Sequence, residues 1–236
     1  MTPGQVQMEG TNDIAATLDS TLLLACPVCQ SDLAETLGVA GGGGDGEPGA
    51  AVVMCCGECG TVYLTPPGPA APDDAPPEFR NPSGDGARYE LIVLDLSLER
   101  ALEPAELLRE VARSLSTGGR IVVIADNAKS SCFAAFGGRH WWGYARPGVR
   151  QQFAAEGLAH LAAASGLQTR SIATRFSAKA WLESMKRWLR DWGAGAGLTA
   201  ALTGRWLVPL AIAGAVESLA VLRGRGAVLV VEMVRT

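Results

Sequence analysis

Two Cys-x-x-Cys pairs constrain this chain more than any other feature of its sequence. They read CPVC and CGEC, and their cysteines are Cys26, Cys29, Cys56 and Cys59. One such turn presents two thiolates from a tight knuckle, and two turns complete the tetrahedral shell of a structural zinc ion. The sequence therefore predicts that these four cysteines bind one Zn²⁺ in a zinc ribbon that spans residues 21–65.

The spacing between the two pairs is long for a zinc ribbon. The 26 intervening residues exceed the roughly 15 to 20 of the common pattern. A glycine-rich tract, residues 41–49, is expected to form a flexible loop that absorbs the excess. Gly57 and Gly60 are expected to supply the positive backbone angles that the second knuckle requires. Cys55 is a neighbouring thiol, but only Cys56 gives the two-residue spacing to Cys59.

Two other states of the paired cysteines stay open from the sequence, namely disulfide bonds and buried free thiols. Residues 1–20, predicted to be a flexible N-terminus, contain three acidic residues and lack the apolar core of a signal peptide. A reducing, cytoplasmic location follows as the default, and paired cysteines there more often bind metal. Cys132 lies far from the others and is predicted to be a small buried apolar residue.

Composition limits the remaining functions. With 236 residues, of which 48% are hydrophobic, the chain has room for one domain and a small metal module. A net charge of −4 gives no electrostatic footprint for nucleic acid, so no nucleic-acid partner is predicted. Residues 66–88 are rich in Pro, Gly, Ala and Asp and are predicted to be a linker. The second domain then spans residues 89–236.

A strand, a helix and a second strand are predicted directly after the linker. Residues 89–95, YELIVLD, are a short apolar run suited to a buried parallel strand. Pro104 suits the first turn of a helix, which continues to Leu115 with one apolar face. A Thr-Gly-Gly turn over residues 117–119 ends this helix, and residues 120–125 form the next strand. This βαβ unit implies parallel pairing with a right-handed crossover.

At this point the sequence resembles a known family. Residues 89–127 are similar to the fourth strand, the following helix and the fifth strand of class I S-adenosylmethionine-dependent methyltransferases. A subgroup with an N-terminal zinc ribbon shares further motifs: the segment FGGRHWWG over residues 136–143, Phe153 with a helix that ends at Gly166, and the closing strand AVLVVEMVRT. The resemblance implies an α/β fold, with the ribbon followed by a partial Rossmann-like sheet equivalent to strands four to seven and its flanking helices.

The family's cofactor site has no counterpart in this sequence. Family members bind S-adenosylmethionine through a glycine-rich turn after a first strand and through an acid at the end of a second strand. Only the linker separates the ribbon from residue 89, and it is too short for three strands and their helices. The tract 41–49 follows no buried strand and opens no helix, so it is no substitute. We expect that the isolated chain does not bind S-adenosylmethionine.

The histidines that the family commonly uses are also missing. Relatives commonly show Glu-His after the fourth strand, where this chain has Glu99-Arg100, and often Pro-Arg-His where residues 147–149 are Pro-Gly-Val. The chain has two histidines, His140 and His160, and both are expected to be structural or solvated rather than catalytic.

Asp95 ends the fourth strand, at the edge where open α/β sheets bind ligands. It is either a functional acid or a capping carboxylate, and the capping role is expected. No catalytic residue is assigned from the sequence, and the cofactor-binding residues are unknown.

The C-terminal third contains two apolar stretches. Residues 178–192 are predicted to be a helix with three tryptophans and a methionine on one side and basic residues around the rest. Such a helix either lies on a membrane surface or packs its tryptophans over a sheet or pocket, and packing is expected. Residues 198–222 are expected to form a buried helix pair. No transmembrane segment is predicted, because the longest uncharged apolar core, residues 206–216, is far shorter than the roughly 20 residues that span a bilayer.

The missing half of the sheet predicts a protein partner. In the complete fold another strand flanks the fourth, so residues 90–95 are expected to present an apolar edge that a second copy or a methyltransferase-like protein covers by strand addition. The function that fits best is a non-catalytic, methyltransferase-like pseudoenzyme that acts as a binding or partner subunit. The alternatives are an S-adenosylmethionine-dependent methyltransferase with an atypical or partner-completed cofactor site, and a membrane-peripheral adaptor.

Overall fold

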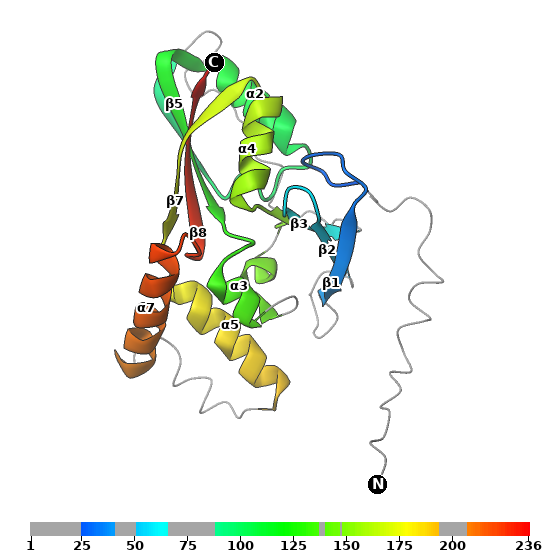
Figure 1. The fold of residues 1–236 in the computed structure, drawn as a ribbon, viewed down its shortest axis with the longest axis vertical. Coiled ribbons are helices and arrows are strands. Elements are labelled where there is room, and N and C mark those ends of the chain that lie inside the picture. The colour runs from blue at the N-terminus through cyan, green and yellow to red at the C-terminus, as the bar shows by residue number, and fades with distance from the viewer. Residues whose placement is uncertain (1–24, 41–50, 66–87, 137–139, 147, 194–206) are drawn as a thin grey trace.

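The structure is a computed structural model that describes residues 25–40, 51–65, 88–136, 140–146, 148–193 and 207–236. The predicted flexible N-terminus, the glycine tract and the linker up to residue 87 lie outside these ranges. The described residues form two four-stranded sheets (Figure 1). The first sheet is antiparallel, and its strands in order are β1 (Ala34–Ala40), β2 (Ala51–Cys56), β3 (Val62–Thr65) and β6 (Gln151–Gln152).

The second sheet contains the predicted βαβ unit. β4 (Tyr89–Asp95) runs parallel to β5 (Leu115–Asp126), and α2 (Pro104–Arg113) connects them. β8 (Val228–Arg235) lies between β5 and β7 (Leu167–Arg175) and is antiparallel to both. The sheet order is therefore β4-β5-β8-β7, and the predicted α/β class with a partial sheet and flanking helices is confirmed.

β5 begins five residues earlier than the sequence predicts. The Thr-Gly-Gly segment does not separate helix from strand but lies inside the strand, where Gly118 has a φ of +77°. Glycine adopts this angle without a steric penalty. Residues 116–119 pair with neither neighbouring strand, and pairing resumes at Arg120. The pairing of β4 with β5 shifts register between Tyr89 and Leu91 and is regular beyond that point.

Two helices, α2 and α4 (Ala155–Ala164), pack on one face of the second sheet (Figure 1). Successive strand residues point to opposite faces, so Ile121 and Val123 of β5 enter this layer and are buried. The opposite face carries Leu91 and Val93 of β4, which are 47% and 52% exposed. The main core therefore lies on one side of the sheet only.

The ribbon shares that core. β3 pairs with β6, which places Val62 opposite Gln152, and the β3 residue Tyr63 is buried in the same cluster as Phe153. Gly157 lies in the first turn of α4, where a β-carbon would come within 2.5 Å of the Thr61 hydroxyl oxygen. Ribbon and sheet thus pack directly against each other.

The remaining helices gather at the carboxyl ends of β4 and β5, which is the lower end in Figure 1. They are α3 (Ser131–Phe136), the short 3-10 helix η2 (Trp142–Ala145), α5 (Ala178–Asp191) and α7 (Leu207–Leu222). The expectation of a buried helix pair is wrong for the described part of 198–222, because Ile212 and Leu222 are 61% and 83% exposed. None of the helices among the described residues is long and apolar enough to cross a membrane.

Candidate metal centre

The first cysteine knuckle is a tight turn closed by backbone hydrogen bonds. The Cys26 N–H donates to the Ser31 carbonyl at 2.8 Å, and the Gln30 N–H donates to the Cys26 carbonyl at 3.0 Å. Gln30 adopts a φ of +62°, an angle that few non-glycine residues take. The Val28 N–H points at the Cys26 sulfur at 3.5 Å. The turn therefore directs a backbone N–H, that of Val28, at the sulfur of its own first cysteine, Cys26.

The second knuckle repeats this geometry with glycine in the strained position. The Cys56 N–H donates to the Thr61 carbonyl at 2.9 Å, and Gly60, with a φ of +67°, donates to the Cys56 carbonyl at 3.0 Å. The expected positive angle is thus confirmed at Gly60. It is wrong for Gly57, whose N–H donates to the Leu33 carbonyl instead.

The two knuckles bring the four predicted cysteines together. All four sulfur atoms lie within 4.8 Å of one another, and the Cys26–Cys59 and Cys29–Cys56 sulfur distances are 3.6 and 3.5 Å. A disulfide would require about 2.05 Å. Zinc–sulfur bonds of about 2.3 Å in a tetrahedron place the sulfurs roughly 3.8 Å apart, close to the distances seen. The cluster is therefore shaped to hold a metal ion.

Electrostatics explains why these thiols need a cation. Cys26 and Cys59 are fully buried, and their sulfur atoms share a hydrogen bond at 3.6 Å. This hydrogen bond lowers the pKa of Cys59 to about 4 and raises that of Cys26. The Thr61 hydroxyl lies 3.2 Å from the Cys59 sulfur and also stabilises its thiolate. A divalent metal stabilises all four thiolates at once, and four protein ligands leave no open position for catalysis.

The other cysteines lie outside the cluster. Cys55 is part-buried, and its thiol points to the Cys56 carbonyl at 3.8 Å. Cys132 is fully buried, as predicted, in a separate group with Trp141. Burial raises the pKa of the Cys132 thiol, so it stays protonated and unreactive.

A second polar site lies at the carboxyl ends of β4 and β5. Glu99 is fully buried there, and its Oε1 accepts a hydrogen bond from the Asp126 N–H at 2.9 Å. Its other oxygen, Oε2, has no hydrogen-bond partner among the described residues. Burial raises the pKa of Glu99 to about 8, although the nearby Arg146, which is paired with Asp126, opposes this shift. Glu99 therefore carries a proton at neutral pH.

No pattern in the sequence predicts this burial, because an acid after a strand is exposed far more often than buried. The only unusual feature of Glu99 in the sequence is the missing histidine beside it. Asp95, by contrast, is exposed at the end of β4, and its carbonyl accepts from the Ser97 hydroxyl. Of the two histidines, His140 lies 3.1 Å from an Asp191 oxygen, and His160 is exposed on α4. Their non-catalytic role stays a prediction.

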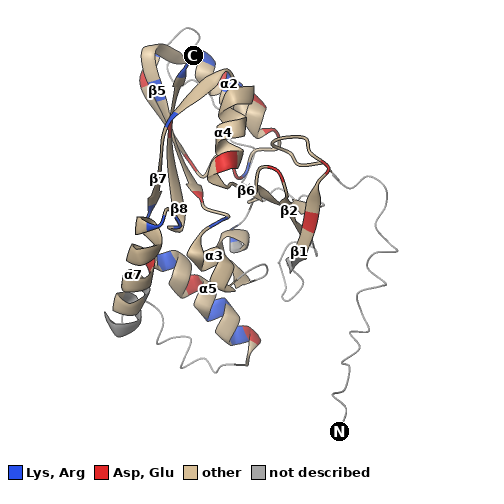
Figure 2. Ribbon diagram, in the orientation of Figure 1, with Lys and Arg blue, Asp and Glu red and all other residues tan. Residues whose placement is uncertain are grey.

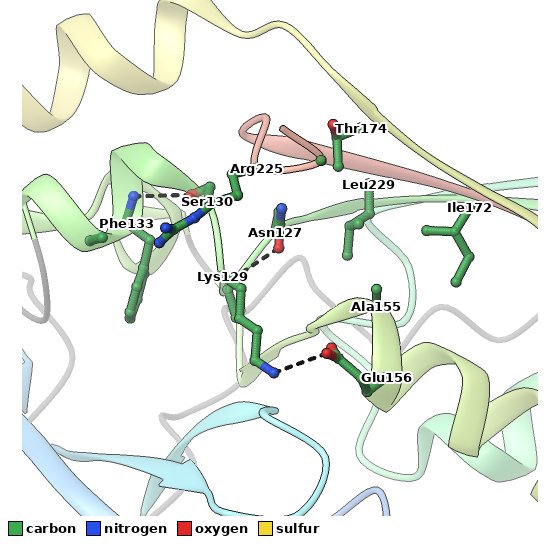
Figure 3. A pocket seen from close by; sticks show the side chains of 13 residues that line it. Asn127, Lys129, Ser130, Phe133, Ala155, Glu156, Ile172, Thr174, Arg225 and Leu229 are labelled. Atoms are coloured by element: carbon green, nitrogen blue, oxygen red, sulfur yellow. Dashed lines mark hydrogen bonds and ion pairs between the residues drawn. The ribbon is translucent and has the colours of Figure 1, made fainter. Parts of the chain in front are cut away.

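A pocket of about 560 Å³ opens beside the end of β5 (Figure 3). Ile172 and Leu229 form part of its apolar wall, and the Lys129 ammonium pairs with a Glu156 oxygen at 3.1 Å across it. Asn127 contributes an amide, but both ends of this amide already bond to the backbone. The sequence did not predict this pocket, since its residues come from segments far apart in the chain.

β4 is the terminal strand of its sheet, so the described chain places no further strand on its outer side. The glycine tract between the cysteine pairs lies outside the described residues.

Comparison with known proteins gives weak likenesses. No family model and no curated protein matches the chain. Similar solved structures include the O-methyltransferase NcsB1 of neocarzinostatin biosynthesis, in complex with S-adenosyl-L-homocysteine and 1,4-dihydroxy-2-naphthoic acid. It is 17% identical over 64% of this chain and 30% of its own, with a TM-score of 0.35. The 4+2 cyclase SpnF is 18% identical over 63% of this chain and 50% of its own, with a TM-score of 0.34. The chain thus matches half or less of either protein's length, and neither likeness defines a function.

Proposed function

We propose that this chain is a zinc-binding, methyltransferase-like protein that acts as a binding or partner subunit and is not an enzyme by itself. The observation that carries the proposal is the edge formed by β4. Among the described strands, β4 pairs with β5 on one side and with no strand on the other. Parallel strands are normally buried on both faces and flanked by further strands, so this end of the sheet is suited to a partner.

The two edges of the second sheet differ in their protection. β7, at the other edge, has a register shift between Thr169 and Ser171 beside Arg170, as β4 has between Tyr89 and Leu91 beside Glu90. Beyond its shift, β7 carries the polar residues Ser171 and Thr174. In β4 the stretch Leu91–Leu94 has no charge, no proline and regular pairing with β5. The ribbon does not cover it, because β3 pairs with β2 and β6. Strand addition is therefore favoured at β4.

The occupant of this edge would extend the sheet and cover its apolar outer face. The exposed side chains of Leu91 and Val93 lie on that face, opposite the α2 and α4 layer. A second copy of the chain supplies an identical apolar strand for antiparallel pairing, and a methyltransferase-like protein supplies a strand with its covering helices. The zinc ion in the cysteine cluster stabilises the ribbon, which in turn supports α4 through Thr61 and Gly157.

The alternative function is methyl transfer with a cofactor site completed by that partner. The protonated Glu99 and the pocket beside β5 favour it, because both lie near the carboxyl ends of strands, where α/β enzymes place their chemistry. In this case the partner contributes the residues that bind S-adenosylmethionine, and the isolated chain still lacks them.

Calorimetric titration of the zinc-loaded protein with S-adenosylmethionine separates the two functions. We expect no saturable heat at micromolar concentration for the isolated chain. Saturable binding would overturn the proposed role, and loss of that binding in Asp95→Ala would locate the site.

Light scattering tests the edge itself. We expect the wild-type protein to associate at micromolar concentration and Val93→Lys to remain a monomer, because an edge lysine opposes pairing. Ile172→Lys on β7 is the matched control, since Ile172 is also exposed, at 44%, and should leave the mass unchanged. Equal effects of the two substitutions would contradict pairing through β4.

A further inference from the structure

Among the described side chains of α7, which are those of residues 211, 212 and 214–222, the outward side is apolar apart from Ser218. Its exposed residues are Ala211, Ile212, Ala215, Val216, Ser218, Leu219 and Leu222. The hydroxyl of Ser218 bonds back to the Gly214 carbonyl at 2.8 Å, so it needs no outside partner. The acid within α7, Glu217, is fully buried on the inward side. Water is a poor environment for such a surface.

Glu217 fixes the orientation of this helix. Its two carboxylate oxygens accept hydrogen bonds from the Trp181 indole of α5 and from the Ala227 N–H that precedes β8. Rotating α7 to hide its apolar side would carry the buried carboxylate away from both donors, which is a costly change. The apolar side is therefore held outward by the rest of the fold.

The shape of the apolar side indicates what covers it. At about 100° per residue, the exposed positions of α7 span an arc of about 160°. A single partner helix contacts a narrower seam of two positions per heptad. An arc of this width suits a flat apolar medium. α5 contacts the inward side of α7 through Trp181, and nearer its own end it exposes Trp188 and Trp192, whose rings lie 5.6 Å apart and which are 39% and 74% exposed. Tryptophan is enriched where membranes meet water.

The charges around this surface differ in sign from those of the whole chain. Residues 178–192 and 207–226 contain six Lys and Arg against three Asp and Glu, a net charge of +3, while the whole chain carries −4. Arg190, Arg223 and Arg225 are exposed, and Figure 2 shows the basic positions along α5. Cations next to an apolar helix face are attracted to anionic lipid headgroups.

We propose that α7 and the end of α5 form a membrane-surface site. The apolar side of α7 enters the headgroup region of one leaflet, the exposed tryptophans lie at the boundary, and the neighbouring arginines bind anionic lipid. The site uses no residue of β4, so it goes beyond the proposed partner function and stands or falls separately from it.

Vesicle co-sedimentation of the zinc-loaded full chain tests this site. We expect binding to phosphatidylcholine vesicles with 30% phosphatidylglycerol, weaker binding to pure phosphatidylcholine, and a decrease with salt. The double variant Ile212→Glu with Leu219→Glu should lose at least tenfold in partition coefficient, because it places two charges on the apolar side. Leu102→Glu, at a residue 58% exposed before α2, is the matched control and should bind like wild type.

Three results would overturn the proposal. One is an absence of wild-type binding to either vesicle. Another is wild-type binding by a double variant whose circular dichroism and melting show that it is folded. The last is a combination of results: without lipid, light scattering finds an oligomer for wild type and a monomer for the double variant, and wild type does not bind vesicles. This combination would assign the α7 surface to a second copy of the chain. If the double variant does not fold, Trp192→Phe is tested instead by tryptophan fluorescence. We expect the emission of wild type to shift to the blue on vesicles and this shift to be smaller in Trp192→Phe. An equal shift in the two proteins would also count against the site.

Discussion

Replacing Glu99 by glutamine should make the fold more stable at neutral and alkaline pH. The folded pKa of this carboxyl is about 8, against an ordinary value of 4.5, and burial is the main cause. Below pH 4.5 the carboxyl is protonated in both the folded and the unfolded chain, so its raised pKa does not lower the free energy of unfolding. Between pH 4.5 and 8 only the unfolded chain releases the proton, and stability falls as the pH rises. The loss is on the order of 5 kcal/mol above pH 8.

Glu99→Gln removes this dependence while it keeps an oxygen for the Asp126 N–H. Urea unfolding at several pH values between 4.5 and 9, with zinc in excess, measures it. We expect the two proteins to be similar in stability near pH 4.5 and the variant to gain on wild type as the pH rises. Glu90→Gln, at an exposed acid on β4, should follow wild type throughout. If the free energies of unfolding of wild type and Glu99→Gln instead change in parallel with pH, the buried, protonated state of Glu99 is refuted. The charges of Asp95, Arg100 and Arg146, which also act on the pKa of Glu99, do not alter this conclusion.

Two further predictions concern the ribbon. Metal analysis should find one zinc per chain. The double variant Cys56→Ser with Cys59→Ser should lose this zinc and, with it, folding free energy on the order of 10 kcal/mol. Full zinc content in the double variant, or loss of zinc in the control Cys55→Ser, would contradict the ligand set. Gly157→Ala should destabilise the fold by about 1 to 3 kcal/mol, because its β-carbon would overlap the Thr61 hydroxyl. A thermal melt unchanged by this substitution would show that α4 does not pack tightly on the second knuckle.

Local patterns in the sequence predicted the parts of the fold that depend on neighbouring residues. The knuckles follow from Cys-x-x-Cys spacing, and β4 and α2 follow from a short apolar run and from Pro104. The outward orientation of α7 was not predictable, because the helix is apolar on all sides and only the partners of Glu217 decide which side is inside. The same holds for β6, whose two glutamines have no strand signal and pair with β3 from far along the chain.

The buried Glu99 was missed for a related reason. Its environment comes from Asp126 and Arg146, which the fold brings to it from later segments. A long-range contact of this kind leaves no periodicity or spacing in the residues around it. The candidate metal ligands, by contrast, are all set by two local turns and the pairing of β1 with β2.

Hydrogen exchange at single-amide resolution across residues 89–95 tests the central proposal most directly. Some amides of β4 bond to β5 in every state, so the test concerns those that point away from β5. We predict that these outward amides exchange slowly at micromolar protein concentration and become fast on dilution or in Val93→Lys, because a partner strand protects them. A monomeric wild-type protein whose outward β4 amides exchange freely at every concentration, with or without a methyltransferase-like partner, would contradict strand addition at this edge.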